Sequence, residues 1–287
     1  MMIELPTPDS IDAIADWIEL RLAITEERLS KAKVASDIES LCGDEPPDHR
    51  ITTVWAELSR RQNLYSKGYF AVNGNTIERV SVHEKTEYVY CLLLSLYGVE
   101  SDANLSGRLF ERLVRGAVEK YLSGKALVFG WPFEQKNDSN QSLTTRLGLQ
   151  IQNIADQLNE RFVEPPPNKF KDRGVDIIGW IEFGDSRSGQ VVILLQSAAG
   201  HNWKGKAPVP EKSWSQYIHW ACNPAIAFAV PCVITKNDWH EVSREKGILF
   251  DRIRILNLLS NAVSDRQLNI ELVEWINNQY SRLDIKV

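Results

Sequence analysis

The run from Gln190 to Leu195 constrains the fold most, because five successive residues in it are aliphatic: Val-Val-Ile-Leu-Leu. A strand with one wet face alternates apolar and polar residues, so a continuous aliphatic run predicts a strand buried on both faces. Residues 225–235 predict a second strand of this kind. Such strands need helices on both sides of their sheet, and the sequence therefore predicts an α/β layer architecture.

Length and composition agree with a globular chain. The protein has 287 residues, of which 43% are hydrophobic and 25% charged, and this excludes a disordered or collagen-like polymer. We expect a mainly helical N-terminal lobe with a short β-hairpin over residues 1–100. We expect an α/β domain with C-terminal helices over residues 101–287.

Helical periodicity in the N-terminal lobe predicts one acidic helix over residues 10–41, and two more over 52–66 and 87–96. Two short strands are expected on either side of Asn73-Gly74, a sequence typical of tight hairpin turns. The acidic helix is interpreted as a solvated face, with an interaction surface as the alternative.

The remainder of the chain alternates between helical and strand patterns. Helices are expected at 105–122, 142–162, 211–221, 252–262 and 265–281, and strands at 126–129, 175–183, 190–195, 225–235 and 248–250. In α/β sheets ligands gather at strand ends, so polar residues at those ends are the candidate site.

Cysteine usage and the N-terminus indicate a cytoplasmic protein. The four cysteines form no Cys-x-x-Cys pair and are too sparse for a disulfide scaffold. The N-terminus has no basic region followed by an apolar run, and so does not resemble a secretory signal. The most apolar stretch of near-helical length, residues 88–97, is about half of a bilayer span, so no membrane association is expected.

Asp176 and Gln196 are the most informative polar residues. Asp176 falls early in one apolar strand and Gln196 ends the next. Antiparallel neighbours would bring the two side chains together, and carboxylate and amide oxygens can share a hard cation such as Mg²⁺. Glu111, in the helix before these strands, is a candidate for a third oxygen ligand.

Each of these residues also has a purely structural interpretation. Asp176 can cap a turn, Gln196 can bond the backbone, and Glu111 can pair with nearby arginines on a solvated helix. The combination of all three favours a site more than any one of them does.

With these residues the sequence resembles the PD-(D/E)xK nuclease superfamily, which has the restriction-endonuclease-like fold. The match comprises Glu111 in LFERLVRGAVEKYL, Asp176 in GVDIIGW and Gln196 in QVVILLQSAAG, and it covers roughly residues 105–235. It is the variant in which Gln replaces the second acid. The resemblance implies a mixed central sheet flanked by helices, with Mg²⁺, or alternatively Mn²⁺, held by Glu111, Asp176 and Gln196.

The chain departs from the family at one catalytic position. The family lysine lies two residues beyond the second acid, where this chain has Ala198. Either Lys204 or Lys206, in the loop that follows, has taken over its role, or the site is weakened or inactive. A catalytically silent module that binds nucleic acid or a protein is therefore the alternative function.

The loop over residues 200–206 is rich in groups that bind phosphate. Residues 200–206 fit the G-x-x-x-x-G-K part of a P-loop motif, but Ala207 replaces the required Ser or Thr and the next residues do not open a helix. We expect nucleic-acid contacts from His201 and Trp203 in this loop, and from Lys171 and Arg173 before the first strand. Core packing is the alternative for Trp203.

The resemblance implies a metal-dependent endonuclease that hydrolyses phosphodiester bonds, with double-stranded DNA favoured as substrate. It also suggests a role in anti-phage defence or restriction, with a homodimer or a protein partner formed through the N-terminal lobe. The net charge of −5 does not oppose this, because residues 1–50 carry 5 basic and 12 acidic groups, while the rest carries 28 basic and 26 acidic groups.

Overall fold

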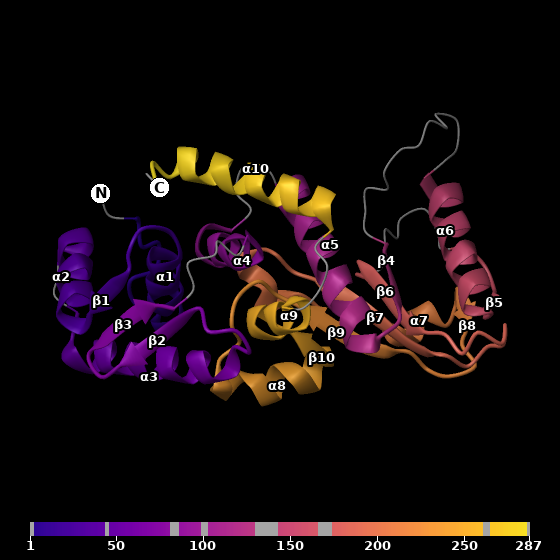
Figure 1. The fold of residues 1–287 in the computed structure, drawn as a ribbon. Helices are drawn as coiled ribbons and strands as arrows, with labels where there is room; N and C mark the ends of the chain where they lie inside the picture. The colour runs from indigo at the N-terminus through magenta and orange to yellow at the C-terminus, as the bar shows by residue number, and fades with distance from the viewer. Residues whose placement is uncertain are drawn as a thin grey trace.

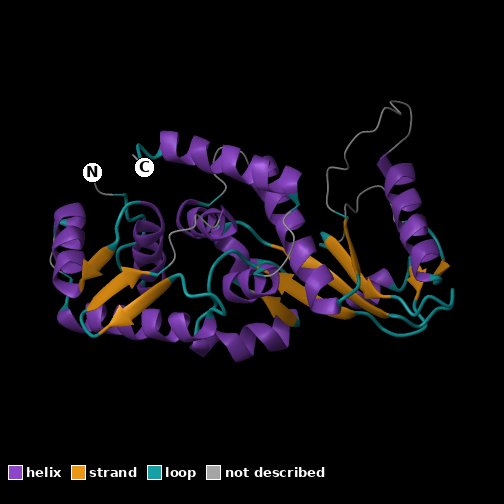
Figure 2. Ribbon diagram, in the orientation of Figure 1, coloured by secondary structure: helices purple, strands orange, loops and turns teal. Residues whose placement is uncertain are grey.

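The computed structural model describes residues 3–43, 46–80, 86–98, 103–129, 143–165, 174–260 and 265–285. Its elements form a lobe of helices around a small sheet, followed by a larger mixed sheet with helices on both faces (Figures 1 and 2). Both ends of the chain lie on the side of the N-terminal lobe (Figure 1).

The N-terminal lobe contains four helices and a three-stranded sheet within the described residues. Its elements are α1 (Ile11–Ile24), β1 (Arg28–Ser30), α2 (Lys31–Cys42), α3 (Asp48–Leu64), β2 (Phe70–Asn73), β3 (Thr76–Arg79) and α4 (Thr86–Tyr97). The hairpin is confirmed, since β2 and β3 pair antiparallel with Asn73 opposite Thr76.

The prediction of one helix over residues 10–41 is wrong. Helix α1 ends at Ile24, and β1 then pairs antiparallel with β3, which buries Leu29 opposite Ile77. Ser30 caps the start of α2, because its hydroxyl accepts a hydrogen bond from the Lys33 amide at 3.1 Å. Pairing with a strand distant in sequence outweighs the helical periodicity at this point.

The second part of the chain forms the larger sheet and its covering helices. Its elements are α5 (Ala103–Leu122), β4 (Lys125–Val128), α6 (Leu143–Leu158), β5 (Arg161–Phe162), β6 (Ile177–Ile181), β7 (Val191–Ser197), the 3₁₀ helix η1 (His201–Gly205), α7 (Glu211–Trp214), β8 (Ile218–His219), β9 (Ala225–Ala229), α8 (Lys236–Lys246), β10 (Ile248–Phe250), α9 (Arg252–Leu259) and α10 (Arg266–Arg282).

The sheet has the order β10-β9-β7-β6-β4 and is mixed. Strands β4, β6 and β7 are antiparallel neighbours, whereas β9 runs parallel to β7 and β10 parallel to β9. The predicted α/β class with a mixed sheet between helices is therefore confirmed. Strand β7 is central, which explains its aliphatic run: Val192 to Leu195 are all at most 3% exposed.

Side chains alternate between two cores on the faces of this sheet. One face, with Ile193 and Leu195, packs against α4, α5 and α9. The other face, with Val192 and Leu194, packs against α6 and α7, and its continuation near Phe228 is covered by α8 and η1. A strand buried on both faces thus has a separate core on each side.

Two helices differ from the predictions. The helix expected over 211–221 ends at Trp214, because the chain then turns into β8, which pairs with β5. Helix α8 was not predicted, although Thr235 caps it by accepting a hydrogen bond from the Asp238 amide at 3.0 Å. A Thr three residues before an Asp was the available signal.

The largest hydrophobic core takes residues from both sides of the predicted boundary near residue 100. It includes Ile14 and Leu92 of the N-terminal lobe together with Phe110 and Leu195 of the α/β part. Helix α10 returns across α4 and α5 and so covers both parts (Figure 1). The division into two domains stays a prediction. Within the described residues, no helix is long and apolar enough to cross a bilayer.

Candidate active site

Two charged side chains bind the backbone amide and carbonyl of Ser197, the last residue of β7. Asp176 Oδ2 accepts a hydrogen bond from the Ser197 amide at 2.6 Å, and Lys206 Nζ donates one to the Ser197 carbonyl at 3.2 Å. The amide and carbonyl of one strand residue point to the same edge of that strand. Asp176 and Lys206 therefore meet at the edge of β7, where β6 has not yet begun.

Register brings Asp176 and Gln196 to the same strand end. The first paired residues of β6 and β7 are Ile177 and Leu195, so Asp176 directly precedes and Gln196 directly follows this pair. The Asp176 amide also donates to the Leu195 carbonyl at 2.9 Å. The predicted proximity of Asp176 and Gln196 thus follows from the antiparallel pairing.

Gln196 is held close to the turn that precedes β6. A Cβ added to Gly174 would lie 2.9 Å from Gln196 Nε2, and Gly174 has a φ of +73°. At the other end of the amide, Gln196 Oε1 is buried and accepts no hydrogen bond from any described residue. A buried amide oxygen without a donor is costly, so this atom is suited to receive a cation or a donor from a ligand.

The structure separates the two candidate lysines of the loop. Lys206 turns back to the strand end through Ser197, whereas Lys204 Nζ pairs with Asp238 Oδ2 of α8 at 2.7 Å. The hydrogen bond to Asp238 is the main cause that raises the pKa of Lys204. Lys204 is thus bound elsewhere, and Lys206 is the one beside Asp176.

A buried lysine that was not predicted from the sequence binds the backbone carbonyl of Lys206. Lys246, the last residue of α8, is 2% exposed, and its ammonium donates to the Lys206 carbonyl and pairs with Glu245 at 3.1 Å. Its Nζ also lies 5.1 Å from the centroid of the Phe228 ring. The sequence could have indicated Lys246 only through a prediction of α8, because Lys246 is the last residue of that helix.

Ala198, at the position where the resemblance leads one to expect a lysine, is completely buried. It belongs to an apolar cluster with Trp203, Phe228 and Val242. Trp203 is 9% exposed and packs 6.3 Å from Phe228, between ring centroids. Trp203 is therefore a core residue, and its predicted role in stacking on a base finds no support at this position.

Helix α5 carries Glu111 past the same end of the sheet. Gly179 of β6 packs beneath Val118 and Leu122, and α5 runs in the direction of β6 because both oppose β4. Glu111 lies seven residues before Val118, or about 10 Å along the helix, and Asp176 lies three residues before Gly179, also about 10 Å. Glu111 is therefore level with Asp176 along the sheet, but α5 covers the face of Ile177 and Leu195, whereas Asp176 and Gln196 alternate to the other face.

The arginines that follow Glu111 have partners on α10. Arg112 pairs with Glu271 at 2.5 Å, and Asp265 Oδ2 lies 3.8 Å from both Arg112 and Arg115. These two arginines are therefore engaged by another helix, and Glu111 has an interaction of its own.

The other predicted nucleic-acid contacts lie elsewhere. The His201 ring packs against Gly98 at the end of α4, where an added Cβ would lie 3.4 Å from it. Lys171 and Arg173 lie outside the described residues. His201 thus joins η1 to the N-terminal lobe.

In the described parts of the chain, no group of three or more His, Cys, Asp or Glu side chains could hold a metal ion. A metal site that includes the Gln196 amide has a different composition from such groups, because Gln is not one of these four residue types. This site stays a prediction. Chemically, the strand end combines one carboxylate, one unpartnered amide oxygen and one ammonium group. Such a set can bind a cation and an anion side by side.

A second charged cluster lies between the lobes, and it corrects the expectation of a solvated acidic helix. Asp16 and Glu19 of α1 are 3% and 0% exposed, and each pairs with both Arg61 of α3 and Arg252 of α9. The hydroxyl groups of Tyr65 and Tyr88 donate to Glu19 Oε2 at 3.0 and 2.7 Å. Burial in pairs explains why these acids lie on an otherwise apolar helix.

The arginines determine the protonation of this cluster. Burial alone would raise the pKa of Asp16, but the guanidinium groups of Arg252 and Arg61 outweigh it and lower the pKa from 3.8 to about 2. Burial, reinforced by the charge of Glu19, raises the pKa of the Tyr88 hydroxyl well above its ordinary value. The cluster is therefore a buried, charged part of the core.

The comparisons with protein-family models, with curated proteins and with solved structures each gave no match. The chemistry of the strand end is therefore inferred from its own residues.

Proposed function

We propose that the protein is a metal-dependent endonuclease with a restriction-endonuclease-like core, and that its active site is the end of β6 and β7. The observation that carries this proposal is the meeting of Asp176 and Lys206 on the two backbone groups of Ser197, next to the unpartnered oxygen of Gln196. An acid, an amide and a lysine at one strand end are the groups that the family resemblance requires. The lysine comes from the following loop, since position 198 is Ala.

The donor set fits a hard divalent cation that retains most of its water. Mg²⁺ in proteins is commonly held by one or two carboxylates and keeps several waters, so a large cage is unnecessary. Asp176 and Gln196 would hold the ion. Glu111, which the resemblance adds as a third oxygen donor, lies on the helix that covers the other face of the sheet. When bound, Mg²⁺ or Mn²⁺ lowers the pKa of a coordinated water and stabilises charge on the scissile phosphate.

The remaining roles fall to residues of the chain itself. Lys206 carries its ammonium group to the edge of β7, where it can neutralise a phosphate oxygen or orient the attacking water. Lys246 holds the backbone of Lys206 in place from a buried position. The Ser197 amide fixes the Asp176 carboxylate, which keeps this ligand aimed at the strand end.

The test is cleavage of supercoiled plasmid and of linear duplex DNA in the presence of Mg²⁺ or Mn²⁺. We expect Asp176→Asn and Lys206→Gln each to lower the cleavage rate about 100-fold or more, because each removes a group that acts on the transition state. Lys204→Gln is the matched control, since Lys204 lies in the 3₁₀ helix directly before Lys206 but pairs with Asp238. Its rate is expected to stay near that of the wild type.

Equal losses for Lys204→Gln and Lys206→Gln would contradict the assignment of Lys206. Cleavage that persists in Asp176→Asn would contradict the site as a whole. The same assay with RNA substrates tests the preference for DNA, which derives from the family resemblance alone.

The alternative function, a catalytically silent nuclease-fold module that binds nucleic acid or a protein, is favoured by one observation. Ala198 is completely buried among apolar side chains, so the family lysine has no equivalent at its usual place. DNA binding measured by fluorescence anisotropy, without cleavage under either metal, would support this alternative.

A role in anti-phage defence or restriction, and a homodimer or partner protein bound through the N-terminal lobe, are further proposals from the resemblance. The acidic residues within positions 1–50 give little support to an interaction surface on the N-terminal lobe, because several of them are buried. Asp16, Glu19 and Asp37 are all at most 3% exposed, and their charges are paired with arginines inside the protein.

A further inference from the structure

A pocket of about 380 Å³ lies where α3, α8 and the start of α9 meet, away from the residues assigned to the active site. Ligand pockets in proteins typically have volumes of about 300–1,000 Å³ and often lie between lobes. The lining residues are Arg60, Leu64, Lys236, Trp239, His240, Asp251, Ile253 and Arg254. They come from segments that are far apart in the sequence.

The polar lining of the pocket is predominantly cationic. Arg60, Lys236 and Arg254 carry positive charges, and Asp251 is the single acid among the lining residues. Asp251 is 3% exposed and uses its oxygens to accept hydrogen bonds from the Arg254 and Ile234 amides. Its carboxylate is thus committed to the backbone, and the other charged residues of the lining are cations.

One of the cations has no partner of its own. Lys236 is exposed and makes no hydrogen bond or ion pair with any described residue, whereas Arg60 forms two hydrogen bonds with Glu57. Lys236 is also the first residue of α8, where the helix dipole adds positive potential. An anionic group is therefore favoured on the Lys236 side of the pocket.

Another part of the lining is aromatic and apolar, and it begins one helical turn from Lys236. The Arg254 guanidinium lies 4.6 Å from the centroid of the Trp239 ring, and Arg254 Nη1 donates to the Leu249 carbonyl at 2.8 Å. Leu64 and Ile253 complete the apolar lining. Aromatic rings and arginine planes are surfaces on which nucleobases stack.

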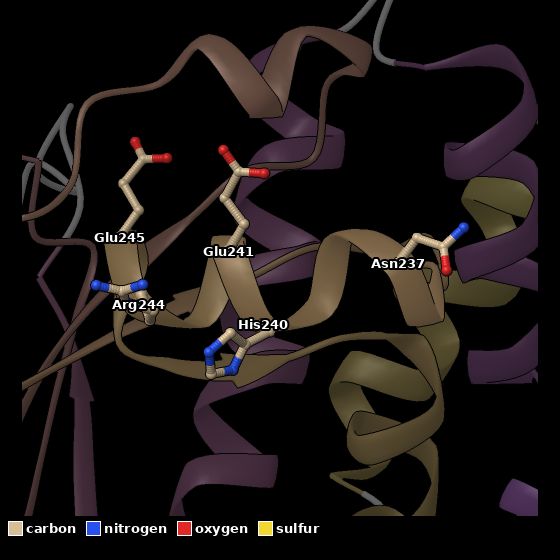
Figure 3. A pocket seen from close by; sticks show the side chains of 5 residues that line it. All are labelled: Asn237, His240, Glu241, Arg244 and Glu245. Atoms are coloured by element: carbon tan, nitrogen blue, oxygen red, sulfur yellow. The ribbon is translucent and has the colours of Figure 1, made fainter.

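Glu241 and Glu245 of α8 are not among the residues that line this pocket. His240 lines both the pocket and a shallow depression on the helix surface with Asn237, Glu241, Arg244 and Glu245. Figure 3 shows the Glu241 and Glu245 side chains on the side of α8 away from the His240 ring. The side chains that α8 presents to the pocket are therefore Lys236, Trp239 and His240.

We propose that this pocket binds a nucleotide unit, with its phosphate near Lys236 and its base against the Trp239 and Arg254 wall. The unit comes from a free nucleotide or from a single-stranded nucleic acid, since both present the same phosphate and base. The proposal does not depend on cleavage, because the pocket shares no residue with the strand end that holds Asp176 and Lys206.

The test is isothermal titration calorimetry of the full chain in buffer with EDTA, which removes metal-dependent cleavage. The probes are AMP, adenosine, inorganic pyrophosphate and a short single-stranded oligodeoxyadenylate. We expect AMP to bind below about 1 mM and to bind more tightly than adenosine or pyrophosphate, because only AMP offers both a charge and a base. The oligonucleotide binding more tightly than AMP assigns the nucleic-acid source, and the reverse order assigns a free nucleotide.

Lys236→Gln and Trp239→Leu should each weaken AMP binding about tenfold, from loss of a charge-assisted contact and of a stacking surface respectively. Lys212→Gln, at an exposed lysine outside the pocket, is the control and should bind like the wild type. Lys236 is exposed, so its variant is expected to fold normally, and the midpoint of thermal unfolding checks this for both.

No AMP binding up to about 5 mM, or pyrophosphate binding as tightly as AMP, would overturn the proposal. Unchanged AMP affinity in the folded Lys236→Gln protein would also overturn it. Asp176→Asn should retain wild-type AMP affinity, because Asp176 does not line the pocket. Absence of cleavage would therefore contradict only the proposed nuclease, and absence of AMP binding would contradict only the proposed nucleotide pocket.

Discussion

Ser197 links the charged groups of the candidate active site through its backbone. Its amide holds the Asp176 carboxylate at 2.6 Å, and its carbonyl holds the Lys206 ammonium at 3.2 Å. Both side chains bind the backbone of one residue, so the distance between them is limited by the backbone as well as by the side chains. This arrangement preorganises opposite charges at the strand end, as a catalytic site requires.

Gly174 offers a direct test of how Gln196 is positioned. We expect Gly174→Ala to lower the free energy of unfolding by about 1–2 kcal/mol, because its positive φ disfavours a Cβ and that atom would press on Gln196 Nε2. Urea unfolding measures the change. Gly205→Ala is the matched control, since Gly205 has no atom within 4 Å of an added Cβ. An equal loss in both variants would contradict the proposed contact.

At the scale of elements, α1, α3 and α9 are joined by a pair of arginines. Arg61 of α3 and Arg252 of α9 are both completely buried and share the carboxylates of Asp16 and Glu19 on α1. The Arg252 Nε also donates to the Tyr65 hydroxyl at 3.0 Å. Two segments separated by most of the chain thus depend on each other for charge neutralisation.

Replacement of one arginine should therefore be severe. Arg252→Met is expected to destabilise the protein by about 3–5 kcal/mol, because Asp16 and Glu19 stay buried with half of their compensating charge removed. Urea unfolding of Arg252→Met and of Arg266→Met, an exposed arginine at the start of α10, gives the comparison. Similar small losses in the two variants would show that the buried pairs add little to stability.

At the scale of the whole molecule, the same cluster makes stability depend on acid pH. The folded protein lowers the pKa of Asp16 from 3.8 to about 2, so folding favours the ionised carboxylate. Its contribution is fully present above about pH 4, and is lost as the pH falls to about 2. Burial raises the pKa of Asp12 and of Asp251, and these two groups contribute with the opposite sign.

We expect the urea midpoint of the wild type to fall steeply between about pH 4 and pH 2, by an amount equivalent to about 2 kcal/mol from Asp16. Asp16→Asn has no titrating group at this position and should show a shallower fall over that range. Parallel pH profiles for the two proteins would contradict a lowered pKa at Asp16.

Several features of the fold could be predicted because they are local or periodic. The aliphatic run before Gln196 predicts a central strand, and four of its five residues, Val192 to Leu195, are buried on alternating faces of the sheet. The hairpin at Asn73-Gly74 and the helix before Gly98 were likewise confirmed. The short turn between two apolar strands also predicted the antiparallel pairing of β6 and β7, which brings Asp176 and Gln196 to the same strand end.

Other features required the tertiary structure, because they depend on partners distant in sequence. Strand β1 divides the predicted acidic helix only because β3 pairs with it. The burial of Asp16 and Glu19 depends on Arg252, more than 200 residues away along the chain. Lys204 and Lys206 are equivalent by composition, and only the packing of η1 against α8 and β7 distinguishes them.

By itself, then, the sequence determined the α/β class, the central strand and the acid and amide at its end, since periodicity and burial act over a few residues. The tertiary structure alone decided which lysine reaches that end and which acids are neutralised inside the protein. It also decided which cations and aromatic side chains share a pocket. Charges act on whatever lies near them in space, and the chain order does not fix that neighbourhood.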